Sequence, residues 1–455
     1  MIMYVESLRT LSIVSVVNNL SKIYEICVFY KYRLPIQVSN SIFEHLKHSN
    51  YSSLSNDDLM FFSSNVVTLT NVSFCEKQIA VVKNFEFLRD HPIEILDIKD
   101  INELEGIIVN INPRSLRKLS LRHCLTTIEQ TRHLGEFLKR CCNLECLDLS
   151  FNSEIGENLI LAFDGLRSSC AMLKKLDLCF CEINGKNAQY LGRLLRNCEK
   201  LESLDLSLNC ISDDGFRAVR DGFRLSCLNL KKLYLSHCSI NDLQTMCLGS
   251  LLQNSKNLES IDLSLNQDLK MGFKDVCYGL KLSNCRLRKI DVSLCLLNEQ
   301  QAYNLADLLQ NLTDLEELNL GFNTGMESGF KAICTSLRSS FLKLKNLYVN
   351  NCSLNRGQVQ YLGNLLKNCK YLHFLYISYD MRIHNEFNKL CHILINSCQR
   401  LGTLKISYTS RTHMKQPCLG KLILTSAYPE HSVLEYKLQF HKDFTDVFKD
   451  FSLLL

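Results

Sequence analysis

The sequence predicts a right-handed α/β horseshoe solenoid, and three observations support that class. First, one frame, L-x-x-L-x-L-x-x-(C/N), recurs at alternating spacings of 28 and 29 residues. Second, each frame precedes a segment whose apolar residues recur at helical spacing. Third, strands stack ~4.8 Å apart whereas packed helices need ~10 Å, so an array of strand–helix units curves with its strands on the concave side.

The frame itself opens eleven times without a break in its spacing. The openings are Leu116, Leu144, Leu173, Leu201, Leu230, Leu258, Leu287, Leu315, Leu344, Leu372 and Leu401. Its last position alternates between cysteine and asparagine from Cys124 to Cys352, and Asp380 and Thr409 depart from that rule. The true unit is therefore a 57-residue pair of repeats.

Each repeat is expected to hold one strand and one helix. In "LESLDLSLN" three leucines face the core, namely Leu201, Leu204 and Leu206. The Asn209 amide satisfies buried backbone groups at the turn, where a cysteine offers only a weak S–H donor. The preceding "GKNAQYLGRLLRNC" forms a helix with four apolar residues on one face, namely Ala188, Leu191, Leu194 and Leu195.

The two ends of the array depart from the regular frame. The segments "VTLTNVSF" (67–74) and "IEILDIKDI" (93–101) predict degenerate strands, as capping repeats should be. "VLEYKLQF", followed by "HKDFTDVFKDFSLLL", predicts a strand and an amphipathic helix. The expected organisation is an N-terminal helical region (1–65), capping repeats (66–115), the regular array (116–412) and a C-terminal cap (413–455).

Composition excludes several classes of protein. The net charge of +5 comes from interspersed charges of both signs, which gives no argument for nucleic acid or a membrane surface as a partner. No apolar run approaches the ~18 residues of a membrane span. Glu6 and Arg9 interrupt the first apolar stretch, so no signal peptide is expected. The 23 cysteines are odd in number and many recur at one repeat position, which predicts reduced thiols in a cytoplasmic or nuclear protein that is not secreted.

The alternating Cys-type and Asn-type repeats resemble leucine-rich repeats of the ribonuclease-inhibitor class over residues 116–412. That class also includes Ran GTPase-activating proteins and the sensor regions of NOD-like receptors. The resemblance implies the horseshoe fold and a protein-binding surface. It leaves the function open, because unrelated proteins use the same fold.

Two segments ahead of the array form a second pattern. On a helix, positions 8, 12 and 16 of "SLRTLSIVSVV" (7–17) share one stripe, and the following "LPIQVSNSIFEHL" has a proline suited to a helix's first turn. Together they resemble the two parts of a VHL box. The BC-box positions, which bind elongin C in that family, are Ser7, Leu8, Ser12 and Val16. The cullin-2-box positions are Leu34, Pro35, Val38 and Ile42.

The VHL-box resemblance implies elongin B–elongin C and cullin 2 as partners, in the manner of ZYG/ZER-type cullin-2 substrate receptors. Ser12 stands where the family has cysteine, and Ile36-Gln37 replaces the second Leu-Pro of the form that selects cullin 5. The armadillo repeats of the ZYG/ZER class have no counterpart here, so their degron specificity is not transferred. The same apolar residues would also serve a helical cap for the array, and both roles are compatible if one face docks while another stays free.

The third, fifth and seventh frame positions are expected on the concave surface. The fifth position supplies an acidic stripe that includes Asp148, Asp177 and Asp205. The stripe suggests a basic ligand, although interleaved lysines neutralise it and L-D-L-S also recurs for local reasons. The C-terminal third offers an aromatic cluster of Tyr348, Phe374, Tyr376, Tyr379 and Tyr408, which is the first choice for a face that binds a still unknown protein substrate. The alternative is that these rings cover the last repeats.

No catalytic, metal or cofactor site is expected. The sequence has no P-loop, G-x-S-x-G or H-E-x-x-H motif, and Cys141-Cys142 has no partner pair at zinc-ligand spacing, so both are assigned to packing. His123 and His237 are two double-repeats apart, too far to share a metal.

We therefore predict a non-enzymatic protein-binding scaffold, with three candidate roles. The first is the substrate-recognition subunit of an elongin–cullin-2 RING ubiquitin ligase. The second is a stand-alone inhibitor or scaffold of the ribonuclease-inhibitor type, for which a net charge of +5 suits basic ribonucleases poorly. The third is a small-GTPase regulator of the Ran GTPase-activating type, whose acidic tail is replaced by "KDFSLLL". A fragment of an immune sensor is disfavoured, since nothing upstream resembles a nucleotide-binding module.

Overall fold

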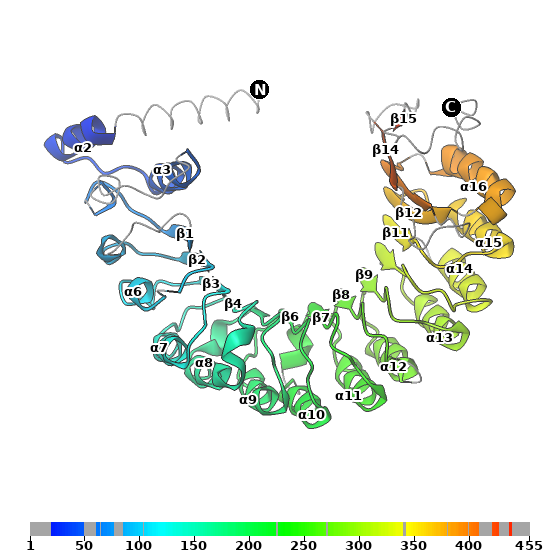
Figure 1. Ribbon diagram of the computed structural model, residues 1–455, viewed down its shortest axis with the longest axis horizontal. Helices are drawn as coiled ribbons and strands as arrows, with labels where there is room; N and C mark the ends of the chain where they lie inside the picture. The colour runs from blue at the N-terminus through cyan, green and yellow to red at the C-terminus, as the bar shows by residue number, and fades with distance from the viewer. Residues whose placement is uncertain are drawn as a thin grey trace, which may run out of the picture. The chain divides into compact units, whose positions relative to one another are not determined.

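The computed structural model describes residues 20–49, 61–63, 65–76, 85–102, 104–223, 226–269, 272–339, 343–379, 381–398, 400–408, 421–426 and 436–438. The chain divides into two compact units, Met1–Ser226 and Cys227–Leu455. Within each unit, neighbouring strands follow chain order and the repeat helices stand on one side of them (Figure 1). Strand–helix repeats in that order form an α/β solenoid of the predicted horseshoe class.

The first unit begins with two helices, α2 (Leu20–Phe29) and α3 (Ile36–Ser49). Its parallel strands are β1 (Asn71–Cys75), β2 (Ile95–Lys99), β3 (Lys118–Arg122), β4 (Cys146–Asp148), β5 (Lys175–Asp177) and β6 (Ser203–Asp205). The α-helices between and after them are α6 (Leu104–Ile108), α7 (Ile128–Leu138), α8 (Ile160–Leu166), α9 (Gly185–Leu195) and α10 (Asp213–Gly222). Short 3₁₀ helices cover Glu86–Leu88, Ser153–Leu159 and Cys170–Met172.

The second unit continues the pattern and ends differently. Its strands are β7 (Lys232–Tyr234), β8 (Ser260–Asp262), β9 (Lys289–Asp291), β10 (Glu317–Asn319), β11 (Asn346–Val349), β12 (Phe374–Tyr379), β13 (Thr403–Tyr408), β14 (Lys421–Ser426) and β15 (Tyr436–Leu438). The α-helices are α11 (Asp242–Leu252), α12 (Phe273–Ser283), α13 (Glu299–Leu309), α14 (Gly329–Ser339), α15 (Arg356–Leu366) and α16 (His384–Ser397). Pairing is parallel from β7 to β13, whereas β14 and β15 pair antiparallel. Ser226–Asn229 and Met381–Ile383 are 3₁₀ helices.

The expected core positions are confirmed. The three leucines of the frame around β6 (Leu201, Leu204 and Leu206) and the four apolar residues of α9 are each at most 1% exposed. Cys141 is also fully buried, as expected for a packing residue, whereas Cys142 is exposed, so its assignment to packing is wrong. None of the described helices has the length and apolar character that crossing a bilayer requires. The described cysteines are free thiols.

The last frame position acts as the sequence predicts. Asn209 is 1% exposed, and its Oδ1 accepts the backbone N–H groups of Cys181 at 3.1 Å and Ile183 at 2.9 Å. Its Nδ2 donates to the carbonyls of Leu178 at 2.8 Å and Leu206 at 2.9 Å. One amide therefore joins its own turn to the preceding repeat. The Cys181 thiol instead has a single weak donor, which the carbonyls of Leu149 at 3.0 Å and Cys179 at 3.6 Å share.

Paired glycines allow the helices to pack closely. A methyl group built at Gly222 of α10 would overlap the carbonyl of Gly192 in α9. The same overlap recurs between Gly165 and Gly135 in the first unit. At these points only a residue without a Cβ lets one helix backbone approach the next.

The structure places strands within both predicted capping segments, β1 at Asn71–Cys75 and β2 at Ile95–Lys99. β15 lies within the predicted "VLEYKLQF" strand. The repeat frame does not predict β14. This strand pairs antiparallel with β13, whereas the strands before it pair parallel. The helix expected after residue 440 lies outside the described residues.

Candidate protein-binding surfaces

The helices that precede the first strand are only partly packed. In α3, Ile42 and Phe43 are fully buried. The Phe43 ring meets Phe62 at 5.1 Å and Phe74 of β1 at 5.6 Å between centroids. This face of α3 covers the first strand, so the helix caps the array.

The predicted cullin-2-box residues are divided between core and surface. Ile42 belongs to the core, whereas Pro35 is exposed and Leu34 and Val38 are half-buried. Ile36, the first residue of α3, is 43% exposed. The accessible part of the box is therefore the start of the helix. The BC-box residues Ser7, Leu8, Ser12 and Val16 lie outside the described residues.

Helix α2 and Tyr30, the residue after it, present apolar side chains to solvent. Cys27 is buried, whereas Ile26, Phe29 and Tyr30 are 56%, 76% and 72% exposed. The rings of Phe29 and Tyr30 contact each other edge to face at 5.0 Å. A helix that is apolar on several sides normally finds partners on several sides. The sequence pattern predicted a helix with several apolar sides for the segment before residue 18, and it assigned no role to α2.

The predicted acidic stripe of the first unit is a row across adjacent strands. The register pairs Ser120 of β3 with Asp148, Asp148 with Asp177, and Asp177 with Asp205. We call Asp148, Asp177 and Asp205 the acidic row. Burial, with Asp205 and Asp148 nearby, raises the pKa of Asp177 to about 6.

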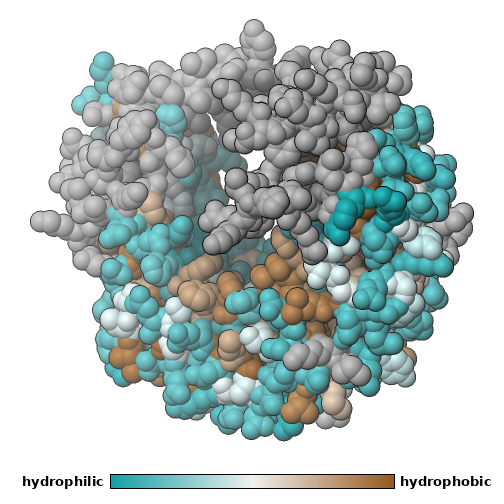
Figure 2. Space-filling model, turned by 45° about the vertical axis from the view of Figure 1, so that its right-hand side comes forward, coloured by the Kyte–Doolittle hydropathy of each residue, from teal (hydrophilic) through white to brown (hydrophobic). Residues whose placement is uncertain are grey.

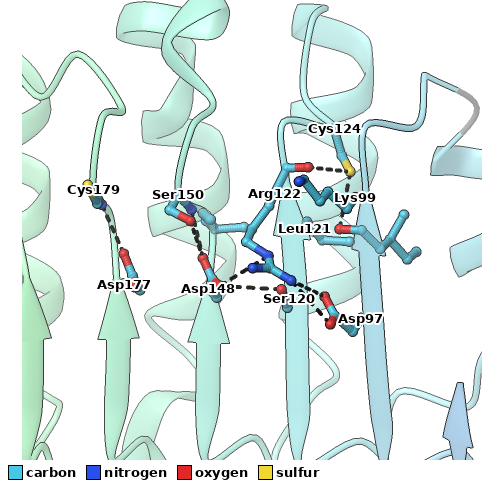
Figure 3. A network of polar contacts seen from close by, with 12 residues as sticks. Asp97, Lys99, Ser120, Leu121, Arg122, Cys124, Asp148, Ser150, Asp177 and Cys179 are labelled. Atoms are coloured by element: carbon cyan, nitrogen blue, oxygen red, sulfur yellow. Dashed lines mark hydrogen bonds and ion pairs between the residues drawn. The ribbon is translucent and has the colours of Figure 1, made fainter. Parts of the chain in front are cut away.

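Two features account for the acidic row without a ligand. Each aspartate accepts the backbone N–H two residues ahead, at 2.9 Å from Ser150, 3.1 Å from Cys179 and 2.9 Å from Ser207. At one end, the Arg122 guanidinium lies between Asp97, at 3.3 Å, and Asp148, at 3.8 Å (Figure 3). These contacts support the view that the aspartate of L-D-L-S recurs because it bonds the backbone of its own turn, and not because it binds a ligand.

The predicted aromatic cluster lies in the second unit. The rings of Tyr348 on β11 and Phe374 on β12 are 4.9 Å apart. The Lys405 ammonium of β13 stands 4.1 Å from the Tyr376 ring centroid, a cation–π contact. Burial and the nearby Glu317 raise the pKa of Tyr348. Tyr379 and Tyr408 oppose each other in the β12–β13 register. The acidic row and the aromatic cluster therefore belong to different units.

An apolar edge that sequence reasoning missed borders the acidic row. Phe151, Phe180 and Leu208 each directly precede the Cys/Asn position, have positive φ of 62°, 54° and 61°, and are 49%, 43% and 39% exposed. The two phenylalanine rings are 5.9 Å apart. Bulky side chains are uncommon at positive φ, where they cost about 1–2 kcal/mol. The signal was present in the sequence as an apolar eighth frame position. On the face drawn in Figure 2, hydrophobic patches likewise lie between hydrophilic residues.

Groups of three or more His, Cys, Asp or Glu side chains that would hold a metal ion are not found among the described residues. Burial raises the pKa of the Cys141 thiol to about 12, so this cysteine stays protonated at neutral pH.

Comparisons with known proteins agree with this geometry. Family models described as leucine-rich repeat match residues 140–157, 197–219 and 229–251. The ribonuclease inhibitor of Mus musculus is 27% identical over 279 residues, which cover 61% of each protein. NACHT, LRR and PYD domains-containing protein 14 of Mus musculus is 26% identical over 326 residues, and the match covers 69% of this chain but 32% of that protein.

A solved structure has a similar fold over nearly the whole chain. It is a chain from the crystal structure of the Rad7 and Elc1 complex in yeast, with a TM-score of 0.52 and 14% sequence identity. The match covers 91% of this chain and 93% of that one. The chain thus has the fold of a leucine-rich repeat solenoid, and its repeats are similar to those of ribonuclease inhibitors.

Proposed function

We propose that this chain is the substrate-recognition subunit of an elongin–cullin-2 RING ubiquitin ligase. The N-terminal region binds elongin C and cullin 2, and the repeats bind a protein substrate. The chain performs no chemistry and contributes proximity between the substrate and the ligase. Such a receptor acts in the cytoplasm or the nucleus.

The observation that supports this role best is that α3 is packed on the array, while apolar side chains of α2 and the first residue of α3 are left in solvent. Ile42 and Phe43 fix α3 to the first strand, while Ile36 at its start and Phe29 of α2 remain in solvent. A helix that served only as a cap would have polar residues on its free side. Exposed apolar residues on a fixed helix are what a partner's hydrophobic groove requires.

Two further observations point in the same direction. The exposed helix surface follows the BC-box pattern in the chain and includes the start of the cullin-2-box pattern, which is the order of a VHL box. A chain of similar fold was crystallised in the complex of Rad7 and Elc1, and this pairing supports an elongin-type partner.

Calorimetric titration of the full chain with purified elongin B–elongin C, and then with cullin 2, tests the proposal. Leu8→Arg is expected to abolish elongin binding. Ile36→Arg should weaken recruitment of cullin 2 at least tenfold, because it places a charge in an apolar contact. Ile128→Arg is the matched control, since Ile128 is also the first residue of a helix and is 47% exposed, against 43% for Ile36.

The proposal fails if the folded wild-type chain does not bind elongin B–elongin C. It fails equally if Ile128→Arg is as damaging as Ile36→Arg. Circular dichroism of every variant establishes that a lost contact is not lost folding.

The second candidate, a stand-alone inhibitor or scaffold, is favoured by the ribonuclease-inhibitor relatives. The match to the Sus scrofa protein covers 68% of that protein at 27% identity. If the folded chain does not bind elongin B–elongin C but inhibits a pancreatic-type ribonuclease, this second candidate is supported.

A further inference from the structure

A cavity of about 480 Å³ in the second unit lies at the C-terminal ends of α15 and α16. Its lining consists of Lys367, Lys370, Tyr371, Asn396, Ser397 and Arg400. Three of these side chains are cationic, the amide and the hydroxyl are hydrogen-bond donors, and no carboxylate is among them. We call this site the basic cavity.

The cations of the basic cavity have no anionic partner within the described residues. At the same edge of the sheet, Lys343 pairs with Asp314 at 2.5 Å and Lys345 with Glu316 at 2.7 Å. Those neighbouring pairs neutralise each lysine with a carboxylate of the preceding repeat. In the basic cavity the cations lack such a carboxylate partner. The cavity therefore concentrates positive charge that an incoming anion would offset.

Arg400 is held in place within the basic cavity. Its guanidinium carbon lies 5.0 Å from the centroid of the Tyr371 ring. Both residues directly precede the first leucine of their frames, so the register of the repeats brings them together. Stacking on the ring restrains the guanidinium and leaves its N–H groups at the edge of the stack available to a ligand.

Helix dipoles explain part of the charge. Lys367 is the C-cap of α15, where a cation is favourable without any ligand. Lys370 and Arg400 lie beyond the helix ends, in the turns that lead to β12 and β13. Their convergence with Asn396 and Ser397 therefore needs a further reason.

We propose that the basic cavity binds a phosphate monoester on a side chain of a partner protein. A phosphate offers three acceptor oxygens and nearly two charges, which matches an arginine, two lysines and two neutral donors better than a single carboxylate does. The volume lies in the range of small-ligand pockets and accommodates a phosphorylated side chain. This inference goes beyond the ligase role and does not depend on it, because every residue involved is in the second unit.

The probe that tests the proposal is a fluorescein-labelled pentapeptide with a central phosphoserine between glycines. We expect saturable binding to the full chain by fluorescence anisotropy at 50 mM NaCl, and displacement by inorganic phosphate. The double variant Lys370→Gln/Arg400→Gln should lose at least tenfold in affinity. Ser397→Asp should lose as much, since it puts a negative charge into the cavity while keeping the cations.

The matched control is Arg193→Gln, because Arg193 also stacks on a tyrosine, Tyr190, at 4.9 Å but lies outside the cavity. Its affinity should equal that of the wild type. Equal binding of the unphosphorylated peptide, or binding that survives in the double variant, would overturn the proposal. So would vesicles containing a phosphatidylinositol phosphate if they bind in a variant-dependent way where the peptide does not, which would make the cavity a lipid site.

Discussion

At the last frame position, the choice between asparagine and cysteine decides how many buried backbone groups are satisfied. The Asn209 side chain bonds two N–H groups and three carbonyls across two repeats. Cys181 has one weak S–H donor, directed at the Leu149 carbonyl of the preceding repeat, and burial raises the pKa of its thiol to about 12. The two residues occupy equivalent positions but contribute unequally to stability.

Asn209→Ala is expected to destabilise the chain by about 3 kcal/mol or more, because it leaves several buried backbone groups without partners. Cys181→Ala at the equivalent position should cost about 1 kcal/mol, the usual cost of a buried substitution. Urea denaturation followed by circular dichroism measures both. Equal losses in the two variants would show that the amide network adds little.

The carboxyl of Asp177 makes stability depend on pH. Its folded pKa of about 6 lies above the unfolded value of about 3.9, so the folded state binds this proton more tightly. The stability of the fold therefore falls as pH rises from about 4 to about 6, and the full penalty applies above about pH 7.

Asp177→Asn removes this penalty while its amide oxygen keeps an acceptor for the Cys179 N–H. At pH 7.5 the variant should be more stable than the wild type by about 1 kcal/mol, a value reduced for partial solvent exposure. Below pH 4 the gain should vanish. Melting temperatures at several pH values measure it, with Asp164→Asn on the exposed side of α8 as the control. A gain that is independent of pH would contradict the assignment.

At the scale of elements, the glycine pairs set how closely the helices pack. Gly222→Ala would push the Gly192 carbonyl away and is expected to cost about 2 kcal/mol. Gly106→Ala on α6 is the control, because its Cβ would meet only the Phe85 ring, at an ordinary 3.8 Å. That change should be neutral or stabilise by about 0.5 kcal/mol through helix propensity. Thermal melts distinguish the two, and an equal response of both variants would refute the packing role.

The N-terminal elements show how one helix serves two purposes. Ile42 and Ile36 lie six residues apart on α3, yet one is fully buried and the other is 43% exposed. The same apolar composition therefore contributes both a cap and an accessible surface. The cap and ligase hypotheses are compatible at this element, and the Ile36→Arg titration tests whether the exposed part also binds cullin 2.

At the scale of the whole molecule, the candidate surfaces are distributed over different parts of the chain. The N-terminal helices and the acidic row belong to the first unit, whereas the aromatic cluster and the basic cavity belong to the second. None of these surfaces shares a residue with another. Binding of elongin and binding of phosphate are thus separable, and the failure of one leaves the other open to test.

The sequence by itself determined the repeat architecture. A spacing of 28 and 29 residues leaves room for one strand and one helix, and the leucine positions assign the core. The Asn209 network followed from elementary chemistry, since a buried amide at a turn must bond the backbone around it.

Only the tertiary structure decided which apolar residues stay in solvent and which charges converge. Lys370 and Arg400 are separated by a whole repeat in the chain, and the stacking of successive repeats brings them to one cavity beside Tyr371. Burial of Ile42 rather than Ile36 depends on the path of α3 over the first strand. β14 reverses direction although no frame position marks it. Such features arise from contacts between segments distant in the chain, whereas the frame records only the local pattern that every repeat shares.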